Sequence, residues 1–489
     1  MELQTMNATS ERLDAPVLVP GKTCWRIERA DRLRLVIDAE DYFRHAKQAM
    51  LKARHSIILI GWDFDTRILL EPKGSTLDGP NKLGRFLDWL AKTRPDLHIY
   101  VLKWDLTVLQ TLFRGSMPLK LLDLISHKRI SFELDGHHPV GAAHHQKIIV
   151  IDDAMAFCGG IDMTSGRWDT RDHLDEDRGR RSPWGRPMGP WHDAATLVDG
   201  AAARALSELA RTRWEEAGRE PIPPAPAGSD PWPDDLDPTV TDVDVAIART
   251  LPLMDDRAEV REIEALYLAG IAAARRTLYL ESQYFASRRI AEAIARRLAE
   301  PDGPEVVVVN PREAEGWLEQ AAMDTARRRL LAMVRAADSG GRFAIYFPVT
   351  QSGEPIYVHA KAMVVDDRLL RIGSSNLNNR SMGFDTECDL AIEATGDDGG
   401  RLGEVIAGVR NDLLAEHLDV ERAEVEARIE AEGSLIGAIE ALRHEGRSLR
   451  PLPPEENGAI EDALAENELL DPERPPKFWR RIARRTRWA

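Results

Sequence analysis

Two histidine–lysine pairs lie far apart in the chain, each in the same short pattern, and together they could carry chemistry. The patterns start at His145 and His359, and both follow the spacing H-x-K-x4-D-x6-G-[GS]-x-[DN]. Near neutral pH an imidazole can act as a nucleophile or transfer a proton, and an ammonium group neutralises an anion. If the two copies meet, they form a pocket with two imidazoles and two lysines, which suits a phosphate. Identical internal spacing in both copies indicates an internal structural repeat.

The other positions of the repeat indicate how these side chains are held. Lys147 and Lys361 are each followed by four apolar residues and then by an aspartate, Asp152 or Asp366. This run predicts a buried strand that ends in a turn, so His and Lys, two residues apart, should point to one face. A single His-x-Lys on a strand is usually an exposed edge without function, but two copies with the same Asp and Gly offsets argue against that interpretation.

The segments around each pattern also repeat, and they predict an α/β fold. Strands alternate with helices in both halves at a spacing typical of an α/β sandwich. The expected elements are an apolar segment and helix over 33–55, strands over 56–62, 98–102, 277–280 and 305–309, and helices over 83–91, 259–275 and 290–298. We therefore expect two similar α/β/α sandwich units related by an approximate twofold axis, with the active site at their seam.

Composition shifts along the chain predict its division into domains. The expected parts are a first unit at 1–219, a linker with seven prolines at 220–238, a second unit at 239–415 and a helical C-terminal extension at 416–489. The loop at 175–189 is either a solvated excursion or a lid over the site. The tail at 475–488 interleaves basic residues with Trp and Phe. It suits either adsorption at an anionic membrane surface or docking on an acidic face of the protein itself.

Bulk composition is that of a soluble globular protein, with 43% hydrophobic and 30% charged residues. The sequence predicts no transmembrane helix and no secretory signal. Cys24, Cys158 and Cys388 have no metal-like spacing and fit a reducing compartment. We therefore expect a cytoplasmic protein, or one peripheral at the inner face of the cell membrane. A net charge of −16 argues against a general nucleic-acid binder.

Further motifs surround the two patterns. They are GGID at 159–162, GRWDT at 166–170 with His173, PWHD at 190–193, YLESQYF at 279–285 and IGSSNLNNRSM at 372–382, closing at Glu387. Together with the repeated H-x-K pattern, they resemble the HKD signature of the phospholipase D superfamily, in particular eukaryotic-type phospholipases D and bacterial phospholipase D-like transphosphatidylases. The resemblance spans roughly residues 33 to 415, and Asn379 departs from it, because the family usually has Asp there.

The resemblance implies phosphodiester exchange in two displacements. His145 would be the nucleophile that forms a phosphohistidine, and His359 would be the acid and base, although the sequence alone does not decide between the two. Lys147 and Lys361 would hold the nonbridging oxygens and stabilise the charge on phosphorus. No metal and no cofactor is expected, because the lysine pair neutralises the charge.

Other residues are expected to support this reaction. Ser374 and Asn376 would donate hydrogen bonds to the phosphate, and Gly160 would let the backbone approach the substrate closely. Family position points to Glu387 as the carboxylate that orients His359, and to Asp169 for His145. A carboxylate at Asp162 would repel a phosphate, so it should bind a lysine or the backbone. Asp152 and Asp366 are expected to be structural.

The leading interpretation is a phospholipase D that hydrolyses or transphosphatidylates a glycerophospholipid. A cardiolipin-synthase-type phosphatidyltransferase is the closest alternative, although such enzymes usually carry N-terminal membrane helices. A nuclease of the superfamily fits the acidic balance poorly. A non-catalytic lipid-binding protein is disfavoured by two intact motifs. The expected partner is a phospholipid substrate, with peripheral contact to a membrane surface and no nucleic acid. The lipid headgroup and the oligomeric state do not follow from the sequence.

Overall fold

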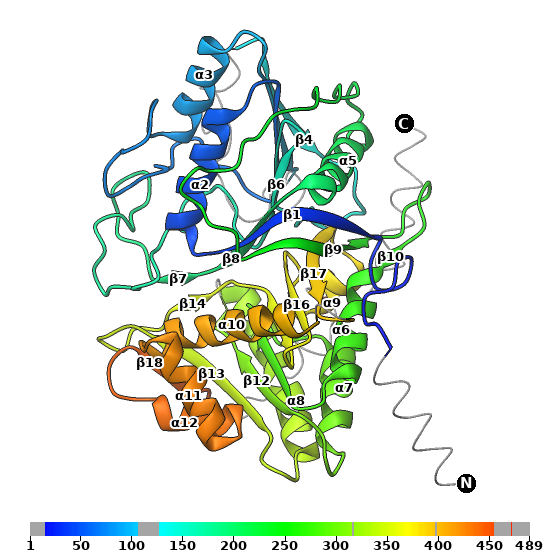
Figure 1. The fold of residues 1–489 in the computed structure, drawn as a ribbon, viewed down its shortest axis with the longest axis vertical. Helices are drawn as coiled ribbons and strands as arrows, with labels where there is room; N and C mark the ends of the chain where they lie inside the picture. The colour runs from blue at the N-terminus through cyan, green and yellow to red at the C-terminus, as the bar shows by residue number, and fades with distance from the viewer. Residues whose placement is uncertain (1–14, 106–126, 315–316, 397–398, 454–470, 472–489) are drawn as a thin grey trace.

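A single mixed sheet runs through both halves of the protein (Figure 1). The computed structural model describes residues 15–105, 127–314, 317–396, 399–453 and 471. The predicted basic tail at 475–488 lies outside these residues. The strand order is β18-β13-β12-β11-β15-β16-β17-β9-β1-β8-β6-β5-β2-β3-β4, and β10 pairs with β9. Apart from the additional edge strand β18, the two ends of this order mirror each other about the β9–β1 pair, as a pseudo-twofold repeat requires.

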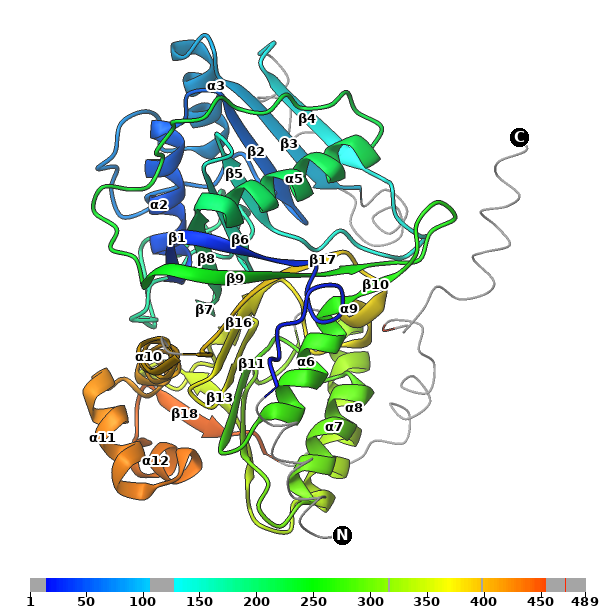
Figure 2. The same ribbon diagram turned by 45° about the vertical axis from the view of Figure 1, so that its right-hand side comes forward.

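The first half runs from β1 to α5. Its elements are β1 (Arg26–Ile37), α2 (Ala39–Lys52), β2 (Ser56–Gly61), α3 (Leu83–Thr93), β3 (His98–Trp104), β4 (Ile130–Asp135), β5 (Ile148–Ile151), β6 (Met155–Gly159), β7 (Trp191–His192), β8 (Ala194–Asp199) and α5 (Gly200–Glu216). Helices α2 and α3 cover one face of the sheet and α5 the other (Figure 2). The four central residues of β2 are all apolar because both faces of the strand are covered: Ile57 and Leu59 pack on one side, Ile58 and Ile60 on the other.

The second half repeats this order and adds helices at its end. Its elements are β9 (Val240–Leu251), β10 (Val260–Arg261), α6 (Glu262–Ala273), β11 (Thr277–Glu281), α7 (Arg288–Leu298), β12 (Glu305–Val309), α8 (Trp317–Ala337), β13 (Phe343–Val349), β14 (Tyr357–Val358), β15 (Ala362–Val365), β16 (Leu369–Gly373), α9 (Asn379–Gly383), β17 (Glu387–Glu393), α10 (Gly399–Leu418), α11 (Arg422–Glu432), α12 (Leu435–Leu442) and β18 (Ser448–Pro451). Helices α6 and α7 cover one face, and α10 to α12 cover the other (Figures 1 and 2). The predicted boundary at 415/416 falls inside α10.

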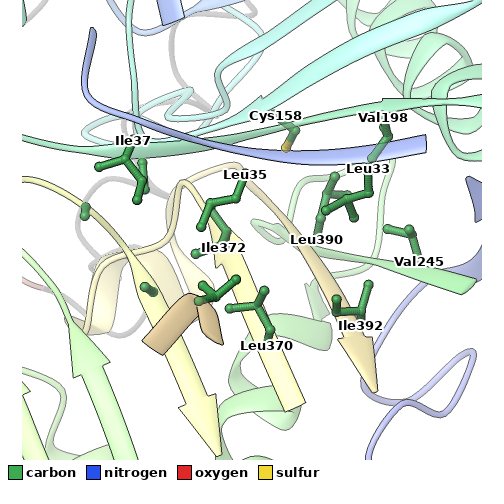
Figure 3. Close-up of a cluster of buried hydrophobic side chains, with 14 of the residues drawn as sticks. Leu33, Leu35, Ile37, Cys158, Val198, Val245, Leu370, Ile372, Leu390 and Ile392 are labelled. Atoms are coloured by element: carbon green, nitrogen blue, oxygen red, sulfur yellow. The ribbon is translucent and has the colours of Figure 1, made fainter. Parts of the chain in front are cut away.

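The two halves are joined by long antiparallel strands. Strand β1 pairs with β9 along most of its length, in a register that sets Ala30 opposite Val243. Strand β17 also packs against β6, and β16 against β8, although these strands share no ladder. Figure 3 shows the resulting core, in which Leu33 and Cys158 from the first half lie among Leu390 and Ile372 from the second. Apolar burial on both sides of the seam therefore fixes the two motifs relative to each other.

The predicted fold class is confirmed, since two α/β units share one seam, but the sequence did not predict β9 or the full length of β1. In the part of the chain that the structure describes, no helix combines the length and the apolar character needed to cross a membrane.

Candidate active site

The two H-x-K segments enter equivalent β-hairpins, β5–β6 and β15–β16. In both copies the strand begins after the lysine, so the predicted strand does not include the His-Lys pair itself. The lysine side chains instead fold back, and Lys147 Nζ donates to the carbonyl of His145 at 2.8 Å. Lys361 donates to the carbonyl of His359 in the same way. Each ammonium group is therefore held beside the histidine of its own motif.

Each histidine is oriented by a carboxylate from the other half of the chain. His145 Nδ1 lies 3.0 Å from Glu387 Oε2 and 3.0 Å from the carbonyl of Ser374. His359 Nδ1 lies 2.6 Å from Asp193 Oδ2. A carbonyl oxygen can only accept a hydrogen bond. The contact between His145 Nδ1 and the Ser374 carbonyl therefore places the proton of a neutral His145 on Nδ1 and leaves Nε2 available to react.

The predicted carboxylate pairing is therefore wrong on both counts. Glu387 holds His145 rather than His359. Asp169 does not reach His145; it accepts from Trp191 N at 2.9 Å, from His173 Nδ1 at 3.0 Å and from Arg180 Nη1 at 3.0 Å. The reason is the packing of β17 against β6, which brings a carboxylate of one half to the histidine of the other.

Asp193 is the orienting residue that sequence reasoning did not assign. It lies just before β8, as Glu387 lies at the start of β17, and the surrounding bonds correspond. Gly160 N donates to the carbonyl of Ala194 at 2.9 Å, and Ser374 N donates to that of Cys388 at 3.1 Å. Extending the repeat alignment to β8 and β17 would have indicated Asp193, which belongs to the PWHD motif already noted.

Ser374 and Gly160 were predicted to contact the substrate, but in the structure they lie against Glu387 and Asp193. Ser374 Oγ donates to Glu387 Oε2 at 2.5 Å and accepts from Cys388 N at 3.0 Å. A Cβ on Gly160 would lie 2.1 Å from Asp193 Oδ1, so only glycine leaves room for the carboxylate that holds His359.

The two lysines have different surroundings. Lys147 Nζ lies 3.1 Å from Asp162 Oδ2, and Asp162 Oδ1 accepts from Trp62 N at 3.1 Å. The expectation that Asp162 binds a lysine and the backbone is thus confirmed. Asn376 occupies the equivalent position in the second copy, and its buried Oδ1 has no hydrogen-bond partner among the described residues. Within 4.0 Å of Lys361, the described part of the chain offers no carboxylate oxygen.

Burial and the lysines together set the protonation of the site. Burial, followed by the charges of Lys147 and Lys361, lowers the pKa of His145 well below its ordinary value. Burial, Lys361, Arg167 and Lys147 do the same for the pKa of His359. The contacts of His145 with Glu387 and of His359 with Asp193 bring both motifs to the seam, and the charges of both lysines act on each imidazole. A bound anion would oppose the lysine charges and raise the pKa of both imidazoles.

Two further groups in the site have shifted pKa values. Burial lowers the pKa of Lys361 to about 7. Burial raises the pKa of Glu387 to about 8, against the opposing hydrogen bonds from Ser374 and Ser381. A cluster of cations at this depth is costly without a compensating anion.

Aromatic rings line both histidines. Trp62 lies edge-on to His145 with ring centroids 6.4 Å apart, and Trp191 lies 5.1 Å from His359. Trp191 stacks on Tyr357 at 4.6 Å. A cavity of about 170 Å³ opens at Tyr357. It is lined by Pro311, Arg312, Glu313, Pro355, Ile356 and Tyr357. The site therefore offers apolar surface next to its charged groups.

Asp152 and Asp366 have the structural role expected of them. Asp152 accepts from the backbone N–H groups of residues 54 to 56, at the start of β2, at 2.7 to 2.8 Å. Asp366 accepts from residues 275 to 277 at the start of β11 over the same distances. Both have a positive φ, 51° and 50°, which Asp tolerates better than most residues. These carboxylates close the turn after the motif strand and do not reach the histidines.

Three comparisons show which known proteins this chain is similar to. The family model described as "Cardiolipin synthase, PLD-like domain" matches residues 267–404. Among curated proteins, phospholipase D A of Dictyostelium discoideum is 25% identical over 74% of this chain and 32% of its own length. Phospholipase D alpha 3 of Arabidopsis thaliana is 24% identical over 71% of this chain and 58% of its own length. The matched regions thus span about a third to three fifths of these relatives.

A solved structure extends the likeness to the whole fold. The crystal structure of phosphatidylserine synthase from Haemophilus influenzae Rd KW20 aligns with a TM-score of 0.54 at 12% identity, covering 88% of this chain and 99% of that one. The doubled motif, the family model and these curated relatives support a protein of the phospholipase D superfamily, and the solved structure shares its fold.

Proposed function

We propose that the protein is a phospholipase D that cleaves the distal phosphodiester bond of a glycerophospholipid, with water or an alcohol as acceptor. The observation that carries the proposal is the crossed pairing of His145 with Glu387 and of His359 with Asp193, beside Lys147 and Lys361. Two oriented imidazoles and two ammonium groups in one buried site are what in-line displacement at phosphorus requires.

In the first step, His145 Nε2 attacks phosphorus and the bond from phosphorus to the leaving alcohol oxygen breaks. His359, protonated once the anionic substrate is bound, gives its proton to that oxygen. The products of this step are a free alcohol and a phosphatidyl group bonded to His145. Glu387 stabilises the positive charge that forms on the attacking ring, as a carboxylate behind a catalytic imidazole does.

In the second step, neutral His359 removes a proton from water or from an acceptor alcohol. The oxygen of that acceptor attacks phosphorus, the phosphorus–nitrogen bond breaks, and His145 returns to its neutral state. Lys361 and Asn376 hold the nonbridging oxygens, while Lys147 shares its charge with Asp162. The scheme uses no metal ion at phosphorus.

A phospholipid suits this site better than a nucleic acid for two reasons. Tryptophans 62 and 191 place apolar surface beside each histidine, and the cavity at Tyr357 lies next to Trp191. The chain also carries a net charge of −16, which would repel a polyanion. A phosphatidyltransferase of the cardiolipin synthase type is the second candidate, favoured by the family model that matches residues 267–404.

A lipid panel tests the proposal. The purified full-length protein would be incubated with vesicles of phosphatidylcholine, phosphatidylethanolamine or phosphatidylglycerol, with and without ethanol, and with single-stranded DNA in parallel. Headgroup release with phosphatidic acid, or phosphatidylethanol when ethanol is present, supports a phospholipase D. Cardiolipin and glycerol from phosphatidylglycerol alone would instead support the transferase. DNA cleavage without lipid turnover would contradict both the phospholipase D and the transferase. The H145A variant serves as the inactive control in each assay.

A further inference from the structure

A second cluster of titratable side chains lies directly behind the carboxylate that holds His359. It consists of Asp38 before α2, His173 in the loop after β6, His192 in β7 and Glu416 in α10. All four are buried, with exposed fractions of 4% or less. None of them is used in the reaction above. The cluster joins three segments that are distant in sequence, and His192 immediately precedes Asp193.

One possible ligand atom from each of these four residues lies within 4.8 Å of the others, close enough for the set to surround a small ion. His192 Nδ1 lies 2.7 Å from Glu416 Oε1 and 3.4 Å from Asp38 Oδ1. His173 Nε2 lies 3.2 Å from Glu416 Oε1 and 3.5 Å from Asp38 Oδ2. A tetrahedral zinc ion with ligands at about 2.0 Å sets neighbouring donors about 3.3 Å apart. Small side-chain movements would bring this set to that geometry.

Each histidine is held from behind as metal-bound histidines usually are. His192 Nε2 lies 3.1 Å from Glu281 Oε2, and His173 Nδ1 lies 3.0 Å from Asp169 Oδ2. A carboxylate on the outer nitrogen fixes the tautomer and directs the other nitrogen to the metal. Glu281 is itself fixed, because Tyr279 donates to its Oε1 at 2.5 Å. This outer arrangement is present on both histidines of the cluster.

The two carboxylates each use one oxygen elsewhere and keep one for the centre. Glu416 Oε2 binds Arg171 Nε at 2.5 Å, which leaves Oε1 between the two histidines. Asp38 Oδ1 accepts from Asp193 N at 3.0 Å. Asp38 Oδ2 is buried and accepts no hydrogen bond from the described residues. A buried carboxylate oxygen that accepts no hydrogen bond and lies 3.5 Å from His173 Nε2 is one that a bound ion would satisfy.

We propose that Asp38, His173, His192 and Glu416 bind one divalent transition-metal ion, with zinc favoured by the two-nitrogen, two-oxygen donor set. The ion links the start of α2, the loop that carries PWHD and helix α10. Because His192 precedes Asp193, the ion also fixes the carboxylate that orients His359. It does not touch the substrate, so its role is structural and positional.

Metal analysis of the full-length protein, purified without chelator, tests this site. About one zinc per chain is expected in the wild type, and less than about a tenth in D38N and E416Q. Because the cluster is buried, exchange requires unfolding, so the protein would also be unfolded with chelator and refolded with and without Zn²⁺. Refolding with Zn²⁺ should raise the Tm of the wild type and leave that of D38N unchanged.

The matched control is E71Q, which breaks the buried Lys47–Glu71 ion pair and touches no member of the cluster. It should lower the Tm and keep the zinc content, so that loss of metal is not confused with general destabilisation. Manganese or iron at one ion per chain would support the site and show that its metal is not zinc. Less than about a tenth of a metal ion per wild-type chain, with no effect of Zn²⁺ on the Tm, would overturn the proposal. The cluster would then be held together by protons shared between its histidines and carboxylates.

Discussion

In the first half of the molecule Lys147 lies against the carboxylate of Asp162, whereas the equivalent position in the second half holds the neutral amide of Asn376. The strands around the two lysines are otherwise equivalent. His145 is held by a glutamate and a backbone carbonyl, and His359 by an aspartate. The comparison teaches that the repeat builds one frame twice, while single substitutions within it give the copies different charges, which fits the different tasks proposed for them.

The largest effect is expected from removing either imidazole. H145A and H359A should each lower turnover of a phosphodiester by about 10⁴-fold or more, since each step uses both rings. Turnover of a soluble chromogenic phosphodiester would be measured, with thermal unfolding as the check on folding. If one variant kept near wild-type activity, the two halves would not act on a common phosphorus.

The next largest effect is expected from Glu387 and Asp193, the two carboxylates that orient the histidines across the seam. E387Q should impair His145 and D193N should impair His359, each lowering kcat by about 10²- to 10⁴-fold with little change in KM. Steady-state kinetics on the same substrate would measure the split, with E71Q as a variant that alters a buried pair outside the site. Unchanged kcat in E387Q would mean that the contact between Glu387 and His145 does not serve the reaction.

Exchanging the residues that distinguish the two lysines should move phosphate affinity in opposite directions. N376D places a carboxylate beside the anion and should weaken inhibition by inorganic phosphate or vanadate by about 10- to 100-fold. D162N removes the carboxylate that pairs with Lys147 and should strengthen inhibition by the same anions several-fold. Inhibition constants at one ionic strength would be compared. Equal effects of the same sign in both variants would contradict the assignment of the anion to the Lys361 side.

The structural aspartates should behave alike in the two halves. D152N and D366N each weaken charge-assisted bonds to three backbone N–H groups, and each should lower the free energy of unfolding by about 1 to 3 kcal/mol. Asn keeps the positive φ that both positions need. Chemical denaturation would give the free energies, and KM should stay unchanged. A large loss of affinity in one variant alone would show that its aspartate also serves the site.

A further expected effect is a pH dependence of stability that comes from Glu387, the carboxylate that holds His145. Folded Glu387 has a pKa of about 8, whereas an unfolded glutamate releases its proton near about pH 4.3. The folded state therefore binds more protons between these values. The stabilisation is complete below the unfolded pKa and is lost as the pH rises through the folded one. The stability of wild type relative to E387Q should thus decline from pH 5 to pH 8, as denaturation at several pH values would show. A constant difference would contradict the raised pKa.

Much of the frame follows from the sequence, because its signals are local. Apolar runs such as Val306–Val309 and the spacing from Lys to Asp predicted the strands, the turns and the structural role of Asp152 and Asp366. The resemblance supplied the fold, and the repeat indicated that both motifs meet at a seam.

The pairing across the seam did not follow, because it depends on how β17 packs against β6 without a hydrogen-bonded ladder. No spacing within either half encodes that contact. For the same reason Ser374 and Gly160 were expected to contact the substrate. In the structure Ser374 contacts Glu387, and Gly160 leaves room for Asp193. The β1–β9 pair was missed because it carries no motif.

The most direct test is to trap the covalent intermediate. The protein would be quenched during turnover of a phosphodiester carrying a labelled phosphoryl group, and the modified peptide mapped by mass spectrometry. The account predicts a label on His145 in the wild type, no label in H145A, and a label that accumulates in H359A when the leaving group needs no protonation. A label on His359, or turnover without any labelled histidine, would contradict it.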